Sequence, residues 1–549
     1  MPKPSAAPRR RRTRASIAAA VIAVGALALS ACSAASPETT PETSSGPVEG
    51  GVLRVALGSD ASIINPHLTG SSVTATITRD VVDSLVAQSE DNSFHPWLAE
   101  DWEVSEDNTE YTFHLRDDVT FSDGEPLTAE AVKINFEYIL DPANNSTYAR
   151  SLLGAVSEIE ATDEHTVVIR YDEPFAPLLQ ALSLPYLGIQ SPAYVQSGGD
   201  LAGDVVGSGP FVLDSWAQGQ GSTLSKRDDY AWGSDSFEHT GAAYLDGIEY
   251  SYLPEASTRL GALTSGQVDA IDAIPPANYE SVTSTDGVVV DTYENPGVVY
   301  AFQLNTTRAP FDDVLVRQAF QTGVDIDTAV KATLFDTVEP AQGILGPQTE
   351  YVDESIDGSW KNDPEGAEAL LDEAGWTETD DDGYRVKDGE RLSVAWTYDE
   401  STSGEDNVNL VQALQSEYRE IGIELVLDPV DSGTATARTT SGDYDLTSYY
   451  FVRAEADILR TVYGSASIGT GNSSRVDSLD AQLNEAVGAD ADRRAELYAE
   501  VQQTVIDEAY SVPVYIPAYH LGHSDELQGV RWATNAKPLF YNAWLDSGE

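Results

Sequence analysis

The stretch that decides the fold is Phe94–Tyr138, FHPWLAEDWEVSEDNTEYTFHLRDDVTFSDGEPLTAEAVKINFEY. Tyr111, Phe113 and Leu115 alternate with polar residues, which is the period of a half-buried strand. A Ser-Asp-Gly turn follows at residues 122–124. Thr128 is then placed as the N-cap of a helix whose apolar side chains share one face: Val132, Phe136 and Ile139. The stretch therefore predicts a strand that leads through a turn into a helix.

The same alternation of strand and helix recurs along the chain from Gly50 onward. The clearest helix is DPEGAEALLDEAGW, with Asp363 as N-cap, Pro364 at the first helical position and Gly375 as the stop. The other elements that we expect are strands at 52–57, 392–396, 423–427 and 512–519, and helices at about 408–420 and 492–508. Because strands and helices alternate rather than segregate, the sequence predicts α/β lobes.

The N-terminus has the composition of a signal peptide, which we assign to residues 1–31. Five arginines and Lys3 precede an apolar segment from about Ala15 to Leu29, and this segment is shorter than the ~20 residues that span a bilayer. Leu29-Ser30-Ala31-Cys32 resembles the bacterial lipobox, and Cys32 is the only cysteine in 549 residues. We therefore expect Cys32 to carry the lipid, and the mature chain to form no disulfide or thiolate metal cluster.

Composition sets the properties of the mature chain. Residues 32–49 are rich in Ser, Thr, Pro and Glu, so we expect a lipid-anchored, disordered linker. The chain holds 31 basic and 90 acidic residues, and six of the basic ones lie in the leader. Such a negative field excludes a nucleic-acid partner and favours cationic ligands over anionic ones, although acidity of this degree is typical of a solvated surface.

Eight segments in order resemble the extracellular solute-binding proteins of the oligopeptide, dipeptide and nickel-binding family, which serve ABC importers. Phe94–Tyr138 is similar to the family signature "P-x-LA-x-x-W", "Y-T-F-x-LR" and "F-x-DG-x-P". The other segments are Asn65-Pro66-His67, VGSGPF (206–211), LTSGQVDAI (263–271), 302–327, ALLDEAGW (369–376), REIGIELVL (419–427) and 493–515. They span about residues 50–520, which is most of the mature chain.

The resemblance implies a two-lobed, periplasmic-binding-protein-like α/β fold of type II, in its large three-domain variant. Lobe I would comprise residues 50–85, 201–299 and 509–549, with an inserted subdomain at 86–200 and lobe II at 300–508. Two crossings between the lobes, near Tyr300 and Tyr510, would form a hinge, and the ligand would lie in the cleft between the lobes.

Motifs for catalysis or phosphate binding are not found in this sequence. It has no GxSxG elbow, no GxxxxGK[ST] loop and no HExxH helix. Gly207, Ser208 and Gly209 form a tight turn that we expect to approach the ligand or a strand. His520 and His523 lack a defined third metal ligand, so we interpret them as part of a surface loop. We therefore expect no enzyme activity, no cofactor and no metal site.

The resemblance places ligand-binding candidates on the segment that follows Tyr444-Asp445. Peptide binders of the family often carry an acid there that pairs with the α-amine of the ligand. If Asp457 takes the place of the second aspartate of that pattern, the amine-pairing position falls at Ala454, beside Arg453. The further candidates for the cleft are Tyr449, Tyr450, Trp396, Asn65 and His67.

Arg453 leaves two hypotheses about the ligand open. A guanidinium attracts a carboxylate and repels an amine. Either Glu455 or Asp457 supplies the acid for an amine, or the ligand is not an ordinary peptide with a free amine. A third interpretation is purely structural, in which Arg453 and Asp457 form an ion pair at i, i+4.

These inferences lead to one main functional hypothesis. We expect a monomeric lipoprotein on the outer face of the cytoplasmic membrane that captures peptides or peptide-like solutes and delivers them to ABC permease and ATPase subunits. A non-peptide ligand, such as a nickel chelate, an opine or an oligosaccharide, is the alternative. A secreted hydrolase and a surface adhesin are more remote, because the sequence shows neither a nucleophile motif nor repeats.

The anchor hypothesis can be tested by replacing Cys32 with Ser. Because the thiol is the atom that would receive the lipid, the variant should leave the membrane fraction, while a Ser33→Ala control should stay there. Fractionation followed by immunoblotting measures this distribution. Membrane retention of the Cys32→Ser variant would show that the lipid-anchor hypothesis is wrong.

Overall fold

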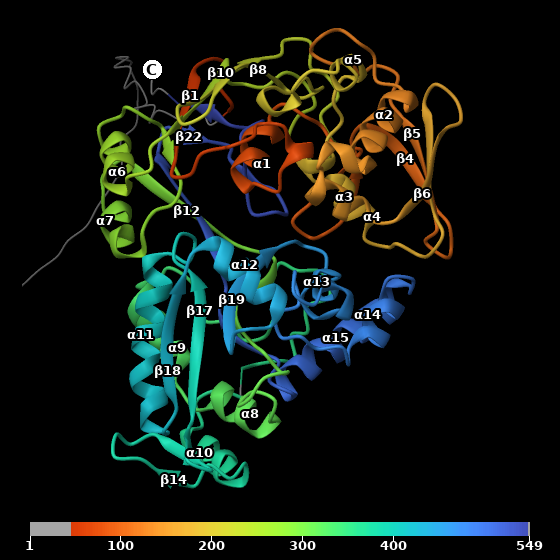
Figure 1. Ribbon diagram of the computed structural model, residues 1–549. Coiled ribbons are helices and arrows are strands. Elements are labelled where there is room, and N and C mark those ends of the chain that lie inside the picture. Colours follow the sequence, from red (N-terminus) through yellow and green to blue (C-terminus); the bar gives the residue numbers. More distant parts are fainter. Residues whose placement is uncertain (1–45, 359, 547–549) are drawn as a thin grey trace, which may run out of the picture. The chain divides into compact units, whose positions relative to one another are not determined.

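Three main sheets organise the computed structural model, which describes residues 46–358 and 360–546 (Figure 1). The predicted signal peptide 1–31, Cys32 and the linker as far as residue 45 lie outside the described residues. The described residues from Pro47 onward form one compact unit. In the described part of the chain, no helix has the length and apolar character needed to cross a membrane.

The first sheet has seven strands and contains the predicted strand 52–57 as β1. β1 runs parallel to its neighbours β10 and β11, and the remaining pairs are antiparallel. In spatial order the strands are β12 (Val288–Glu294), β21 (Ala518–Ser524), β11 (Ala270–Ile271), β1 (Val52–Leu57), β10 (Gly247–Tyr252), β9 (Gly221–Lys226) and β8 (Phe211–Ala217). The helices of these segments are α1 (Ser72–Arg79), α6 (Ala256–Thr264) and α7 (Tyr279–Thr283). We call this part lobe I.

The second sheet has four antiparallel strands, all from one continuous stretch. Their spatial order is β4 (Ala99–Val104), β5 (Glu110–Leu115), β7 (Thr166–Tyr171) and β6 (Val156–Ala161). The helices of this stretch are α2 (Ala129–Leu140), α3 (Thr147–Leu153), α4 (Leu178–Ser183) and α5 (Pro192–Val195). We call this part the inserted subdomain.

The third sheet has five strands, and one of them, β13, is buried along its whole length. In spatial order the strands are β18 (Glu424–Val430), β17 (Ser393–Asp399), β19 (Leu446–Val452), β13 (Gly297–Leu304) and β20 (Ser511–Tyr515). Its helices are α8 (Val314–Thr322), α9 (Ile326–Leu334), α10 (Pro364–Glu373), α11 (Glu405–Glu420), α12 (Ser432–Ser441), α13 (Ile458–Tyr463), α14 (Asp480–Ala486) and α15 (Ala491–Asp507). We call this part lobe II; the predicted borders of all three parts remain predictions.

Short ladders complete the strand pairing. They are β2 (Val86–Gln88) with β3 (Phe94–Pro96), β14 (Glu378–Thr379) with β15 (Arg385–Lys387) and β16 (Glu390–Arg391), β22 (Leu527–Gln528) with β25 (Trp544–Leu545), and β23 (Arg531–Trp532) with β24 (Pro538–Leu539).

The predicted helix boundaries agree with the structure where capping residues marked them. The Thr128 side chain accepts a hydrogen bond from Ala131 N and begins α2. Asp363 accepts one from Gly366 N, Pro364 is the first residue of α10, and Gly375 follows the helix with a φ of +89°. The helix expected from residue 408 begins three residues earlier, at Glu405. Gly404 precedes it, so no N-capping side chain marks this start in the sequence.

The chain passes between the sheets of lobe I and lobe II twice. The first crossing lies at Asn295–Pro296, between β12 and β13. The segment 512–519, which the sequence presented as one strand, is divided at Ile516–Pro517: β20 pairs with β13 in lobe II, and β21 pairs with β12 in lobe I. The second crossing therefore lies several residues beyond the expected position near Tyr510.

The two crossings are hydrogen-bonded to each other. Asn295 N donates to Pro517 O at 2.8 Å. Gly297, directly after the first crossing, has a φ of +97°, and a Cβ there would lie 2.2 Å from Phe451 O. Only glycine fits this position without displacing the β19 backbone.

Asn65 and His67, expected in the cleft, are buried where lobe I meets the inserted subdomain. Asn65 and Gln190 exchange two side-chain hydrogen bonds of 3.1 and 3.0 Å, and His67 Nε2 donates to Gly188 O at 2.8 Å. Burial lowers the pKa of His67 to about 4. This corrects the expectation: both side chains hold residues 188–190 in place, and only 0% and 1% of their surfaces are exposed.

The glycine turn at 207–209 packs closely against the backbone at Val81. Gly209 N donates to Val81 O at 2.9 Å, and a Cβ at Gly207 would lie 2.1 Å from the same oxygen. Ser208 is buried, and its Oγ donates to Asp83 at 3.0 Å. Of the two roles that we considered for this turn, the structure shows close approach to another backbone segment.

Trp396, a further expected cleft residue, belongs to the core of lobe II. It is fully buried on β17, stacks on Tyr398 at a centroid distance of 4.1 Å and donates from Nε1 to Ser448 Oγ at 2.9 Å. Trp396 therefore packs in the hydrophobic core of lobe II, together with Leu392, Val394 and Leu446.

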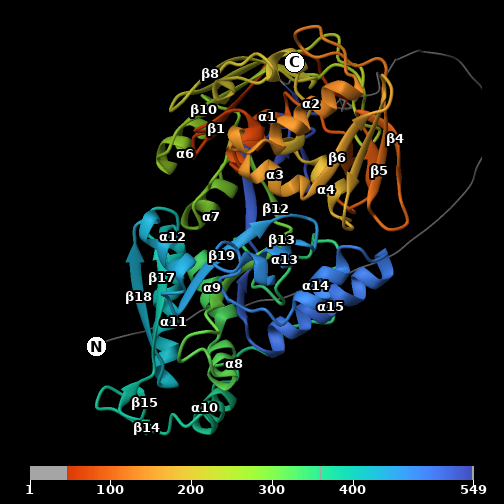
Figure 2. The same cartoon turned by 45° about the vertical axis from the view of Figure 1, so that its right-hand side comes forward.

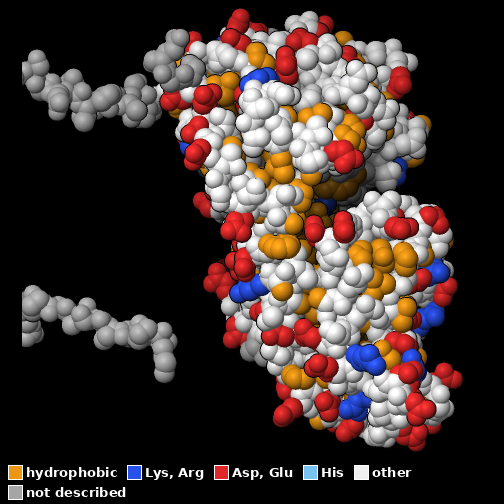
Figure 3. All heavy atoms as spheres, turned by 90° about the vertical axis from the view of Figure 1, so that its left-hand side faces the viewer, with side chains coloured by type: hydrophobic (Ala, Val, Ile, Leu, Met, Phe, Trp, Pro, Cys, Tyr) orange, Lys and Arg blue, Asp and Glu red, His pale blue; other side chains and the backbone are white. Residues whose placement is uncertain are grey.

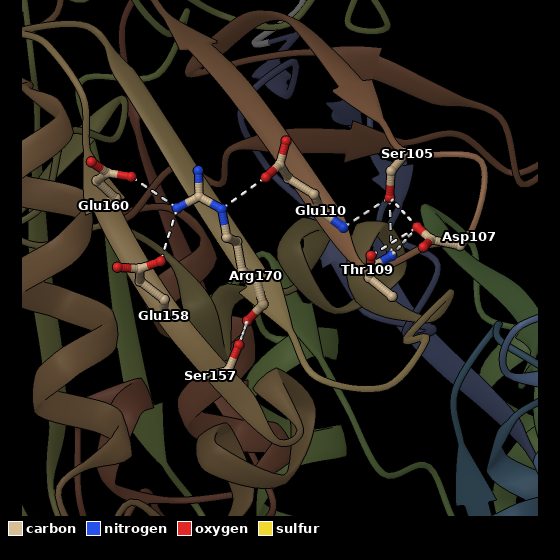
Figure 4. Close-up of polar contacts among 8 residues, drawn as sticks. All are labelled: Ser105, Asp107, Thr109, Glu110, Ser157, Glu158, Glu160 and Arg170. Carbon is tan, nitrogen blue, oxygen red and sulfur yellow. Dashed lines mark hydrogen bonds and ion pairs between the residues drawn. The ribbon is translucent and has the colours of Figure 1, made fainter.

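The acidic composition is visible on the surface. On the face in Figure 3, red acidic side chains are widely spread and blue basic ones are sparse. In the inserted subdomain, Arg170 on β7 bonds to Glu110 at 2.7 Å, Glu158 at 3.0 Å and Glu160 at 2.8 Å (Figure 4). One cation on β7 thus offsets the repulsion among three carboxylates on its two neighbouring strands, β5 and β6.

The pKa of His67 predicts part of the pH dependence of stability. Because the folded pKa lies below the unfolded value of 6.5, the unfolded chain binds the proton first as the pH falls. His67 therefore costs no stability above pH 6.5, and it costs about 1.4 kcal/mol per pH unit between 6.5 and 4.

A His67→Gln variant should show this cost directly. Gln keeps an N–H donor for Gly188 O but does not titrate, so the stability deficit of the variant at pH 7.5 should shrink by about 2 kcal/mol at pH 5. Urea unfolding at both pH values measures it. A deficit that is the same at both values would contradict the prediction.

Candidate ligand-binding cleft

A cavity of about 280 Å³ lies between the inserted subdomain and lobe II. Figures 1 and 2 both place α3 and α4 opposite α13, and the cavity is lined from these two sides. The residues that define it are Ser151, Phe175 and Gln180 from the subdomain, and Arg453, Asp457 and Arg460 from lobe II. We call it the α4–α13 cavity.

Direct contacts close this side of the cleft. Ala176 N in the subdomain donates to Val487 O in lobe II at 3.0 Å. Asn92 Nδ2 donates to Gln348 O at 3.3 Å, again between residues on the two sides. The two sides therefore touch at two places, and the contact at Ala176 lies next to Phe175, which lines the cavity.

A second cavity, of about 330 Å³, lies beside the two crossings. It is lined by Asp272, Pro276, Tyr519 and His520 from lobe I, and by Asp406, Asn407, Tyr450 and Tyr515 from lobe II. We call it the hinge cavity. Its walls combine aromatic rings with acidic and amide groups, as ligand pockets often do.

Arg453 lies just after β19 and lines the α4–α13 cavity. Its Nε is buried and has no hydrogen-bond partner. Its backbone N donates to Pro296 O at 3.3 Å, which fixes the residue against the first crossing. Of the sequence candidates, Arg453 is the one whose charged group the structure places at a cavity without an ion pair within the described residues.

Asp457 pairs with Arg460 and not with Arg453. Arg460 donates to both carboxylate oxygens, at 2.9 and 2.6 Å, across an i, i+3 spacing at the start of α13. Asp457 is buried and also accepts from Tyr498 Oη at 3.3 Å. The ion pair that we considered between Arg453 and Asp457 is therefore replaced by one with a different arginine.

Glu455 is buried in lobe II and is not among the residues that line the α4–α13 cavity. Arg494 Nη2 donates to its Oε1 at 2.5 Å, and both side chains are almost fully buried. Arg494 is also placed over the ring of Tyr351, 5.1 Å from the centroid. Burial raises the pKa of Glu455, and the guanidinium of Arg494 opposes that shift. The Glu455 carboxylate is thus already paired with the buried guanidinium of Arg494.

Tyr449 and Tyr450, neighbours on β19, point to different sides of the sheet. Tyr449 donates from Oη to Gly471 O at 2.5 Å and packs against Phe451. Tyr450 is 46% exposed and lines the hinge cavity. Only the second of the two candidates therefore presents its ring to a cavity.

His520 and His523 lie on β21 rather than on a surface loop. Three residues apart on a strand, their side chains point to opposite faces. His520 Nδ1 bonds to Thr292 Oγ1 at 2.9 Å, and His523 Nε2 approaches Asp291 at 3.2 Å. Among the described residues, no group of three or more His, Cys, Asp or Glu side chains is arranged to hold a metal ion.

Two residues that line the α4–α13 cavity, Gln180 and Arg460, were not predicted from the sequence. Gln180 sits in the apolar run PLLQALSL, and a single amide in such a run is a detectable signal that we did not use. Arg460 was missed because the i, i+4 spacing from Arg453 to Asp457 was considered without the i, i+3 alternative. The arrangement of guanidinium, amide and hydroxyl groups suits non-covalent recognition.

Comparison with known proteins agrees with this geometry. The family model "Bacterial extracellular solute-binding proteins, family 5 Middle" matches residues 93–467. The probable D,D-dipeptide-binding periplasmic protein DdpA of Escherichia coli K12 is 27% identical over 498 residues, which covers 87% of this chain and 91% of DdpA.

Solved structures show the same fold over nearly the whole chain. NikA from Brucella suis, in complex with Fe(III)-EDTA, is 25% identical with a TM-score of 0.78 and covers 90% of this chain and 100% of its own. DppA from Helicobacter pylori, in complex with the peptide STSA, is 25% identical with a TM-score of 0.73 and covers 91% and 99%. The predicted periplasmic-binding-protein-like fold is confirmed, and the chain belongs to the bacterial extracellular solute-binding proteins of family 5.

Proposed function

We propose that this protein is the substrate-binding lipoprotein of an ABC importer, and that it captures peptides or peptide-like solutes in the cleft and delivers them to the permease. The single observation that supports this most is that both cavities are lined by residues from opposite sides of the cleft. A solute held there makes contacts that exist only when the two sides approach, so binding favours closure.

The paired crossings supply the hinge in this proposal. Two short segments, joined by the bond from Asn295 N to Pro517 O, connect lobe I with lobe II. A hinge needs only a few residues that absorb the change in backbone angles. The contact of Ala176 with Val487 lies on the subdomain side of the cleft and would form and break as the cleft closes and opens.

The mode of action that we propose is binding and release without covalent chemistry. The cavity walls present hydrogen-bond donors, acceptors and aromatic rings. The match to a family named for solute binding supports this interpretation. The protein would act as a monomer, without a cofactor and without a nucleic-acid partner, since its charge repels phosphate backbones.

Cys32 would anchor the protein to the outer face of the cytoplasmic membrane. The support lies in the sequence: a leader of signal-peptide composition, a lipobox-like motif and a single cysteine at its end. The segment after it, as far as residue 49, would act as the tether.

One specific observation is also compatible with a second class of solute. Arg453 has no anionic partner among the described residues, which suits a chelate or an opine as well as it suits a peptide. The neighbour crystallised with Fe(III)-EDTA and another with agropinic acid show that proteins of this fold accept such ligands.

A ligand screen tests the proposal. Tri- to pentapeptides, opines, oligosaccharides and nickel–histidine chelates would be offered to the mature protein in thermal-shift and native mass spectrometry experiments. A true ligand at 100 times its Kd should stabilise the fold by about 2.7 kcal/mol and raise Tm. Saturable turnover of a ligand, or failure of every class to bind, would count against the proposal.

A cavity-filling variant locates the binding site. Ser151 is exposed on α3 and lines the α4–α13 cavity, so Ser151→Trp should weaken binding of the best ligand at least tenfold without loss of folding. Ser416 is exposed on α11, and Ser416→Trp is the matched control that should bind normally. Equal affinities for the two variants would place the ligand elsewhere.

A further inference from the structure

We infer that the α4–α13 cavity is a carboxylate subsite, in which Arg453 from lobe II and Gln180 from the inserted subdomain jointly bind an ionised carboxylate of the solute. The inference rests on the proposed function and specifies the chemistry of its ligand. It also chooses between the two hypotheses that Arg453 left open, since it assigns this position to an anion and not to an α-amine.

The first support is the unused hydrogen-bonding capacity of Arg453. A guanidinium has five N–H donors in a fixed, planar arrangement. The Nε of Arg453 is buried without a partner, and no ion pair of Arg453 is found within residues 46–358 and 360–546. A buried donor without a partner costs free energy, so its persistence at a cavity wall indicates an acceptor that arrives with the ligand.

The second support comes from the opposite wall. Gln180 on α4 is only 2% exposed, it lines the same cavity, and its Nε2 has no hydrogen-bond partner. The residues on either side of it in the chain, Leu179 and Ala181, are apolar. Two residues that line one cavity from separate parts of the chain thus each carry an unpartnered N–H group, and a carboxylate can accept from both.

The third support is that the acids near the cavity already have partners. Both oxygens of Asp457 accept from Arg460, and Glu455 is paired with Arg494. Asp480, which also lines the cavity, accepts from the backbone N of Ser465 at 2.8 Å and from its hydroxyl. An incoming ammonium group would have to compete with these partners, whereas a carboxylate meets donors that are free.

The position of the two donors connects recognition with closure. Gln180 belongs to the subdomain and Arg453 to lobe II, so a carboxylate between them bridges the cleft beside the contact of Ala176 with Val487. The cavity of about 280 Å³ is close to the lower end of the range of ~300–1,000 Å³ for small-molecule pockets. It therefore has room for the part of the solute that carries the carboxylate.

Three matched peptide pools test the inference. All contain tri- to pentapeptides without Asp or Glu: one with free ends, one with C-terminal amides and one with N-acetyl groups. Native mass spectrometry and calorimetry on the mature protein should show that amidation weakens binding at least tenfold, the scale of one charge-assisted hydrogen bond, while acetylation has little effect.

The outcomes separate the two claims. Equal binding of the free and the amidated pools, or loss of binding on acetylation alone, overturns the carboxylate subsite and leaves the proposed function intact. Binding of none of the three pools contradicts peptide capture and removes the basis of the inference at the same time.

Variants assign the effect to the two side chains. Arg453→Ala and Gln180→Leu should each weaken the free pool while leaving the weak affinity for the amidated pool unchanged, and Arg453→Lys should restore part of the loss. Arg419→Ala, an exposed arginine at the end of α11, is the matched control. Far-UV circular dichroism and Tm verify folding. A loss of affinity that is the same for both pools would show a structural role only.

Discussion

The hydrogen bond from Asn295 N to Pro517 O joins the two places where the chain passes between lobe I and lobe II. On one side of it β12 pairs with β21, and on the other side β13 pairs with β20. The two antiparallel ladders thus continue each other through the crossings. Because both connections lie side by side, lobe II can turn about them as a unit while each sheet keeps its own hydrogen bonds.

Several features of the cleft depend on this arrangement. Gly297 allows β13 to start directly beside β19, and Arg453 is fixed at the end of β19 through its bond to Pro296 O. The hinge cavity lies beside the crossings, and the α4–α13 cavity lies at the subdomain side of the cleft. A rotation about the crossings would move the walls of both cavities together, which couples solute contacts at one end of the cleft to those at the other.

Local patterns predicted the elements well, because their causes are local. Thr128, Asp363 and Gly375 mark helix ends through their own backbone and side-chain bonds, and these positions were confirmed. The strand at 512–519 was divided because a tertiary constraint intervened: Pro517 lies between strands that pair in different sheets. An apolar run contains no information about which sheet receives each half.

Site residues were harder to predict than the fold, for a physical reason. Trp396, Asn65 and His67 have side chains that serve a binding site and a polar core equally well, and only burial distinguishes the two uses. Arg453 became a candidate because a basic residue occupies a position beside the one where the family pattern often places an acid. Gln180 became a candidate only in the folded structure, where it lines the same cavity as Arg453 and its amide has no partner. Arg453 lies more than 250 residues after it in the chain.

The strand order also determines which sheet can be completed first while the chain is synthesised from its N-terminus. All strands of the five-stranded sheet come from the continuous segment 297–515, so lobe II has every strand once residue 515 is available. The seven-stranded sheet is different, because β21 lies between β12 and β11. Although lobe I begins first in the chain, its sheet stays incomplete until residues 518–524 have been synthesised and β21 can form. Until then, the edges of β12 and β11 that pair with β21 have no partner strand.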